Sequence, residues 1–141
     1  MATLLAVCSS ERKDLLKKPV QKACFIEDHG IQGDAHAGSE IRQVSLLRME
    51  DIEEAEKEAG FSFPFGSLAE NLVISGLPEE IEKGSLIYLG GQVVLEFVEK
   101  GKKPEEPHSY DYKGWCLLPE KGYFLRVIKG GEVSPPEEAL F

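Results

Sequence analysis

Short apolar runs separated by glycine, proline and charged residues make up most of this chain. Runs of this kind, bounded by turn residues, are typical of β-strands. The pattern predicts strands over residues 3–8, 23–26, 41–47, 72–74, 85–89, 92–98 and 123–128. A Gly90-Gly91 turn joins two of them into a hairpin. Residues 132–141 contain two adjacent prolines and are expected to tail off from the fold.

One stretch follows a helical period instead. Apolar residues recur at helical spacing from Met49 to Ala59, and Gly60 stands where a helix-ending glycine belongs. The sequence therefore predicts one main helix among many short strands. Because a barrel leaves no unpaired strand edges, this pattern favours a mainly β domain that closes into a β-barrel.

Composition narrows the possible classes of function. The 141 residues suffice for a single domain over residues 1–141. A formal net charge of -9 repels a nucleic-acid backbone, so we expect no nucleic-acid partner. No apolar run approaches the roughly 20 residues that cross a bilayer, and no signal-peptide pattern is found. Cys8, Cys24 and Cys116 show no CxxC spacing, which argues against disulfides and structural zinc. We expect a cytoplasmic protein with no membrane partner.

Residues 30–45 combine conformational freedom with chemically capable side chains. Three glycines in this stretch permit a positive φ or a close approach of a ligand to the backbone. The polar groups between and beyond them suit an oxyanion, a phosphate or a metal oxo group. The candidate ligand-binding residues of this stretch are Asp34, His36, Arg42, Gln43 and Ser45. The alternative is a glycine-rich turn that leads into a strand and carries solvated polar residues.

Each of these side chains has an expected role if an anion binds. Arg42 would clamp two oxygens of the anion, Gln43 would donate a hydrogen bond, and His36 would act as donor or acid. Asp34 would repel a bare anion, so it is expected to orient the cationic side chains or to accept N–H groups of a pterin.

Two other stretches add candidates. Glu70 and Asn71 interrupt an apolar run just before a strand, where they either shape a ligand pocket or anchor a loop. Residues 100–112 form a long loop without apolar period, which we interpret as a lid that brings His108 to the pocket. A metal site built on His29, His36 or His108 has no supporting spacing, so none is predicted.

Four motifs in order resemble those of the MOSC domain family, named for the C-terminal domain of molybdenum cofactor sulfurase. They are Gly-Ile-Gln-Gly-Asp-Ala-His-Ala-Gly (30–38), Arg-Gln-Val-Ser-Leu-Leu (42–47), Gly-Ser-Leu-Ala-Glu-Asn-Leu (66–72) and the stretch from Gly114 to Gly131. The match covers residues 3–133 and is nearest to small stand-alone bacterial members. It implies a β-barrel of the pyruvate-kinase barrel-domain type.

The resemblance also implies a function. Family members are proposed to bind molybdenum cofactor or to carry sulfur to a metal-sulfur acceptor, which implies a sulfur-donor or molybdoenzyme partner. Pyridoxal phosphate binding is implied as well. That property is inherited mainly from sulfurases with a separate N-terminal domain, and we do not expect it here.

The proposed carrier cysteine of the family is where this sequence departs from the pattern. Pro104 stands at the expected position, whereas Cys116 matches a second cysteine seen in related sequences. Two hypotheses stay open. In one, Cys116 carries a persulfide to a bound metal cofactor. In the other, Cys116 is a packing residue and the chain is a non-catalytic module that binds a pterin or phosphorylated ligand.

Overall fold

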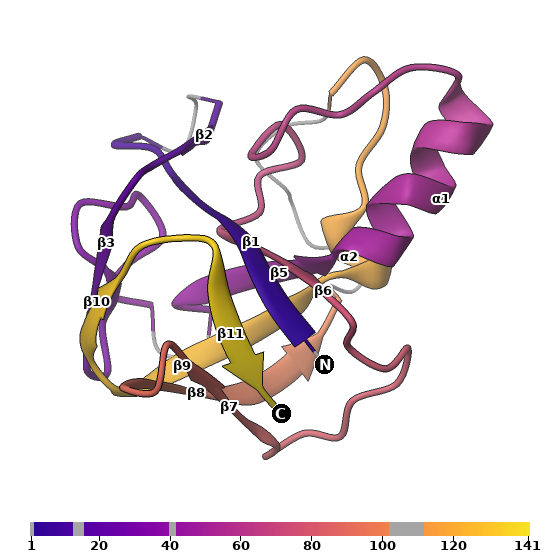
Figure 1. Cartoon of the computed structure of the whole chain (residues 1–141). Coiled ribbons are helices and arrows are strands. Elements are labelled where there is room, and N and C mark those ends of the chain that lie inside the picture. The colour runs from indigo at the N-terminus through magenta and orange to yellow at the C-terminus, as the bar shows by residue number, and fades with distance from the viewer. Residues whose placement is uncertain (1, 13–15, 40–41, 102–111) are drawn as a thin grey trace.

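The computed structural model describes residues 2–12, 16–39, 42–101 and 112–141 (Figure 1). Its strands are β1 (Ala2–Ser9), β2 (Lys18–Pro19), β3 (Ala23–Ile26), β4 (Gly30–Ile31), β5 (Val44–Arg48), β6 (Leu72–Ser75), β7 (Leu86–Leu89), β8 (Val93–Lys100), β9 (Tyr123–Lys129), β10 (Gly131–Val133) and β11 (Glu137–Leu140). Its helices are α1 (Met49–Ala59) and α2 (Leu118–Lys121). No helix in the described ranges is both long enough and apolar enough to span a membrane.

Seven of the strands in the described part of the chain close into a barrel, as the sequence predicted. Around the barrel the order is β1, β11, β7, β8, β9, β5, β6 and back to β1. β5 and β6 pair in parallel, and the other neighbours pair antiparallel. Along β8, buried side chains alternate with less buried ones. The buried apolar side chains point into the barrel and fill its interior.

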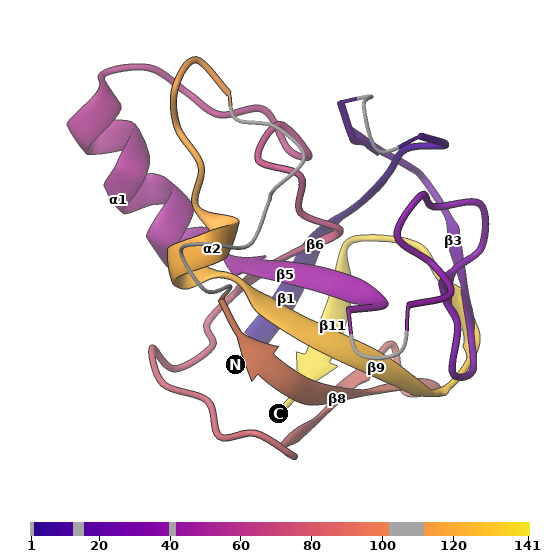
Figure 2. The same ribbon diagram turned by 180° about the vertical axis from the view of Figure 1, so that it is seen from behind.

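A small antiparallel sheet of β10, β3 and β4 adds to the barrel core (Figures 1 and 2). Phe25, Ile31 and Val133 of this sheet are buried in the same cluster as the interior residues of the barrel. Because β4 opens the 30–38 stretch, this packing fixes where the glycine-rich turn leaves the core.

The predicted main helix is confirmed with its bounds. Gly60 adopts φ 81°, and its N–H donates to the Glu56 carbonyl at 2.9 Å, which ends α1. α1 and α2 lie next to one another outside the barrel (Figures 1 and 2). They cover a second apolar cluster that includes Leu47, Ile52 and Val73. This cluster packs on the outer side of β1, β5 and β6.

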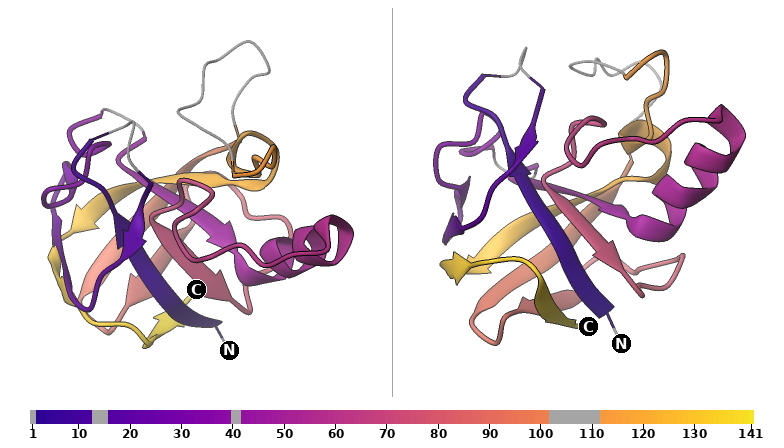
Figure 3. Two further views of the ribbon diagram at one scale, coloured as in Figure 1. Left: turned by 90° about the horizontal axis from the view of Figure 1, so that it is seen from above. Right: turned by 45° about the horizontal axis from the view of Figure 1, so that its top comes forward.

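The chain differs from the prediction at several places, and the two-residue strands β2 and β4 are among the elements that were not predicted. Residues 132–141 do not tail off, since β10 and β11 occupy most of them and β11 closes the barrel between β1 and β7. As a result, the two ends of the chain lie close together (Figure 3). The strand expected over residues 41–47 begins at Val44, so Arg42 and Gln43 precede it. The short helix α2 was not predicted.

Candidate functional site

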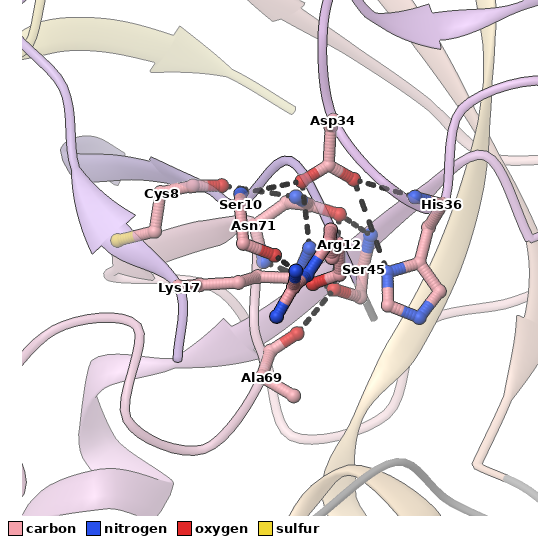
Figure 4. A network of polar contacts seen from close by, with 9 residues as sticks. All are labelled: Cys8, Ser10, Arg12, Lys17, Asp34, His36, Ser45, Ala69 and Asn71. Atoms are coloured by element: carbon pink, nitrogen blue, oxygen red, sulfur yellow. Dashed lines mark hydrogen bonds and ion pairs between the residues drawn. The ribbon is translucent and has the colours of Figure 1, made fainter. Parts of the chain in front are cut away.

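The carboxylate of Asp34 is the centre of a buried polar network (Figure 4). Its Oδ1 lies 2.6 Å from Lys17 Nζ and accepts the backbone N–H of Ser10 at 3.1 Å. Its Oδ2 accepts the backbone N–H of His36 at 3.1 Å and lies 3.9 Å from His36 Nδ1. The Lys17 side chain is 1% exposed, and that of His36 is 28% exposed. Lys17 therefore forms the floor of the network, and His36 forms its solvent-facing edge.

The glycine-rich turn places Asp34 in this network. A Cβ at Gly30 would lie 2.9 Å from the Gln43 carbonyl, and Gly30 has φ 129°, so glycine is needed for both reasons. The N–H of Ala35 donates to the Ser10 carbonyl at 2.8 Å, which docks the turn on the chain after β1. The stretch is thus a glycine-rich turn with a buried carboxylate, and ligand binding by its residues stays a prediction.

Sequence reasoning missed Lys17, which lies between the strands predicted over residues 3–8 and 23–26. Its neighbour Lys18 is exposed, as expected for a lysine in such a segment. No apolar period or spacing distinguishes the two lysines. Only the contact with Asp34, 17 residues further along the chain, identifies the buried one.

Asn71 and Ser45 lie beside this network and tie strands together. Asn71 Nδ2 donates to the Cys8 carbonyl on β1 at 2.9 Å. Asn71 Oδ1 accepts the N–H of Ser45 on β5 at 3.0 Å. The Ser45 hydroxyl donates within the same group, to Ala69 O at 3.2 Å. These contacts give Asn71 the anchoring role that was one of its two predicted interpretations, and a direct ligand contact stays a prediction.

Glu70 anchors the turn that precedes Asn71. Its two carboxylate oxygens accept the N–H groups of Gly66 at 2.9 Å and Leu68 at 3.0 Å. Burial raises the pKa of Glu70 to about 7, although these N–H donors and the nearby Lys17 ammonium act in the opposite direction. A Cβ at Gly66 would overlap the Lys17 carbonyl, so the anchored turn packs directly on the Lys17 backbone.

Arg42 and Gln43 have contacts elsewhere on the barrel. Arg42 Nε donates to Glu99 Oε1 at 2.7 Å, and its guanidinium lies 5.3 Å from the centre of the Phe124 ring. The buried Gln43 amide donates to Asp28 and accepts the N–H of Val127 at 3.0 Å. Gln43 thus joins the turn after β3 to β9. The clamp predicted for Arg42 would require an anion to compete with Glu99.

The three cysteines have different surroundings. Cys8 is fully buried, and this burial, with a contribution from Glu70, raises the pKa of its thiol far above the ordinary value. Cys24 is half-buried on β3. Cys116 is half-buried between Trp115 and Leu117, in the segment that packs on the second apolar cluster beside α2. The buried Cys8 is therefore poorly suited to react as a thiolate.

The long loop holds the remaining sequence candidates. His108, Pro104 and most of the predicted lid lie outside the described residues. Within the described ranges, no group of three or more His, Cys, Asp or Glu side chains could hold a metal ion.

Comparisons with known proteins identify the fold. No family model matches the sequence, and no curated protein matches it either. The structure is similar to that of the YuaD protein from Bacillus subtilis, with a TM-score of 0.75 and 20% identity over 99% of this chain and 94% of that chain.

It is also similar to YiiM from Geobacillus stearothermophilus, with a TM-score of 0.69 and 16% identity over 99% of this chain and 74% of that chain. For YiiM from Escherichia coli the TM-score is 0.68, with 19% identity over 100% of this chain and 70% of that chain. The chain therefore has the barrel fold seen in YuaD and YiiM.

Proposed function

We propose that this chain is a MOSC-type domain that binds an anionic ligand, molybdenum cofactor or a related phosphorylated pterin, at the Lys17–Asp34–His36 network. Its similarity to YuaD and YiiM, small bacterial proteins with a MOSC-like fold, supports the domain type. The order of the four sequence motifs supports it independently. The ligand is inferred from the chemistry of the network.

The buried Lys17 ammonium is the observation that carries the proposal. Removing an ammonium and a carboxylate from water costs several kcal/mol for each ion, and their attraction only partly offsets that cost. An apolar pair of the same size would often stabilise a fold equally well or better. A buried pair at the base of a glycine-rich turn, with an imidazole at its edge, is better explained by recognition of a ligand.

The donor set fits an oxyanion. The 2.6 Å contact with Asp34 orients the Lys17 ammonium, which supplies a positive charge at a fixed place. The half-exposed His36 imidazole would donate a hydrogen bond to a phosphate or oxo group. The backbone N–H of His36 already donates to Asp34 Oδ2, and this hydrogen bond fixes the His36 backbone relative to the carboxylate. If bound, the cofactor would supply metal and sulfur chemistry, while these residues would bind and orient it.

Sulfur carriage is the further step of this proposal, and it needs a reactive thiol. Cys116 is the candidate carrier, since Cys8 is buried and its thiol stays protonated. The second candidate function is a binding module without sulfur chemistry. The protonated Cys8 beside the network and Pro104 at the expected carrier position favour it.

Thiol labelling separates these two functions. Iodoacetamide should modify Cys116 of the native protein faster than Cys24 if Cys116 carries sulfur, because thiolates react and thiols do not. Mass spectrometry of freshly purified protein would also show a persulfide on Cys116. Equal or slower labelling of Cys116, with no persulfide, would contradict sulfur carriage and favour the binding module.

Ligand binding is tested with two neighbouring lysines. Native mass spectrometry of protein made in a host that synthesises molybdenum cofactor should show bound cofactor in the unmodified chain and in Lys18→Met. Lys17→Met should lose it, because Lys18 is exposed and Lys17 supplies the buried charge. Thermal melting verifies that each variant is folded. Equal cofactor occupancy in folded Lys17→Met would refute the proposed site.

A further inference from the structure

β7 carries apolar side chains on both of its faces. Ile87 and Leu89 are fully buried in the barrel. Leu86 and Tyr88 point the other way and are 42% and 37% exposed. A strand with one face in water normally alternates between apolar and polar residues, whereas a run of apolar residues is typical of a strand that is covered on both faces. The sequence of β7 is therefore that of a strand with a cover on its outer face.

The register of the barrel extends this apolar surface over the neighbouring strands. Tyr88 lies opposite Leu140 on β11 and opposite Val94 on β8. Residues directly opposite one another in a sheet point to the same face. Leu140 is 52% exposed and Val94 is half-buried, so an apolar row crosses three strands. We call this row, together with Leu86 on β7, the β7 patch.

In the part of the chain that the structure describes, neither helix lies over the β7 patch. Figure 1 shows α1 and α2 on the right of the barrel and the small sheet of β10, β3 and β4 on the left, while β7, β8 and β11 lie at the bottom. Figure 2 shows the same separation from behind. The helices instead cover the apolar cluster on β1, β5 and β6. The exposed side chains of the β7 patch are thus available to a second molecule.

The charges beside the β7 patch differ in sign between its two flanks. On the β9 flank, the exposed Lys129 lies opposite Val94. The exposed Arg126 lies opposite Glu96 on the same flank and binds it at 3.1 Å. On the β11 flank, Glu138 is exposed. The surface therefore changes from acidic at β11, through apolar at β7, to basic at β9.

A twofold axis matches such a surface to itself. If the axis runs along β7 between two facing barrels, the β11 flank of one copy faces the β9 flank of the other. Leu140 of one copy then packs against Val94 of the other, and Glu138 faces the flank of Lys129 and Arg126. The net charge of -9 opposes self-association in general, and this face offers a contact in which opposite charges meet.

We propose that the β7 patch is the interface of a homodimer, in which two copies of this chain pack face to face about an axis along β7 and exchange their acidic and basic flanks. Tyr88 lies near the axis, where a large aromatic side chain contributes most to binding. This inference is independent of the proposed anion site, because none of the residues of the patch belongs to the Lys17 network.

The size of the face sets the expected strength of the dimer. Four strands about 4.8 Å apart, and about 14 Å long over the four residues of β7, span roughly 20 Å by 14 Å. A standard interface buries about 800 Å² on each partner. This face is smaller, so we expect a reversible dimer that dissociates on dilution in the micromolar range.

Sedimentation equilibrium of the full chain from about 1 µM to about 200 µM should show the mass rising from that of the monomer toward twice that mass. Tyr88→Glu puts a carboxylate of each copy near the axis, so its dissociation constant should be at least about tenfold higher. Ile26→Glu is the matched control, since Ile26 on β3 is also 37% exposed but lies outside the patch. It should dimerise like the unmodified chain. Thermal melting verifies that each variant is folded, and Leu86→Lys replaces Tyr88→Glu if that variant does not fold.

Charge reversal tests the arrangement of the flanks. Glu138→Lys should weaken the dimer, because the new lysine faces Lys129 and Arg126 of the other copy, and adding Lys129→Glu to it should restore association. An unchanged dissociation constant in Glu138→Lys would overturn the proposed arrangement.

Two results would overturn the interface itself. One is a monomer at every concentration, which would leave a different protein as the occupant of the β7 patch. The other is a dimer that persists unchanged in folded Tyr88→Glu or Leu86→Lys, which would place the contact between copies on another face.

Discussion

Asn71 and Ser45 bind one another in both directions. The backbone N–H of Ser45 donates to Asn71 Oδ1 at 3.0 Å, and the backbone N–H of Asn71 donates to Ser45 Oγ at 2.9 Å. The side-chain Nδ2 of Asn71 also donates to the Cys8 carbonyl on β1. One side chain thus joins the ends of β1 and β5 at the start of β6, where the regular ladder does not supply these bonds.

Truncation of this amide should therefore destabilise the barrel. Asn71→Ala leaves the N–H of Ser45 and the carbonyl of Cys8 buried without their partner, and each such group costs about 1–3 kcal/mol. We expect the free energy of unfolding, measured in urea, to fall by about 2–4 kcal/mol. Gln92→Ala, which removes an exposed amide bonded to Glu132 O, should change it by less than about 0.5 kcal/mol. A similar small change in both variants would contradict the anchoring role.

A second prediction concerns two lysine–carboxylate pairs that differ strongly in burial. Lys17 and Asp34 are 1% and 0% exposed, whereas Lys22 and Glu132 are 64% and 58% exposed. Removing one partner of a buried pair typically costs about 3–5 kcal/mol, because the other charge stays buried. A double-mutant cycle with Lys17→Met and Asp34→Asn should give a coupling energy above about 1 kcal/mol.

The exposed pair is the matched control. Lys22→Met and Glu132→Gln should be additive within error, since water and salt screen that interaction. Additivity in both cycles would mean that Lys17 and Asp34 are held in place by other contacts and do not stabilise one another.

These two predictions also show what the sequence could and could not reveal. Alternation in β8 and the helical period of α1 are local signals, so most of the barrel strands and the main helix could be predicted. The glycine-rich turn and Asp34 were found because glycine spacing is also local. The burial of Lys17 was not predictable, because it depends on a contact with a carboxylate that the chain brings back from a distance.

A third prediction follows from the pKa of Glu70. Because burial raises this pKa to about 7 from an ordinary value of 4.5, the folded chain binds the proton more tightly than the unfolded chain between these values. The contribution of Glu70 to stability is thus fully present below pH 4.5 and is lost as the pH rises to about 7. The free energy of unfolding of the unmodified chain, relative to Glu70→Gln, should therefore decrease over this range.

Urea unfolding of the unmodified chain and of Glu70→Gln at several pH values tests whether this difference in free energy decreases with pH. The comparison cancels the contributions of the other titrating groups, which the two chains share. A difference that increases with pH would mean that the N–H donors and Lys17 outweigh burial and hold the pKa of Glu70 below its ordinary value. A difference independent of pH would mean that Glu70 titrates alike in both states.

The last prediction concerns β11, the barrel strand that the sequence analysis did not predict. Glu137, Glu138 and Leu140 are partly or fully exposed, so the only fully buried side chain of this strand is Ala139, at 2% exposure. One small residue gives no apolar alternation. The strand is specified instead by its neighbours, since Ala139 lies opposite Ala2 on β1 and Leu89 on β7.

Closure of the barrel should consequently depend on this one position. Ala139→Asp places a carboxylate between two apolar strands, and an unpaired buried charge costs several kcal/mol, so the variant should be largely unfolded or melt far below the unmodified chain. Leu140→Asp puts the same side chain at the adjacent, 52% exposed position and should cost about 1 kcal/mol or less. Circular dichroism melting compares the two. Equal melting temperatures would show that β11 is dispensable, and that the other barrel strands hold together without the strand that joins β1 to β7.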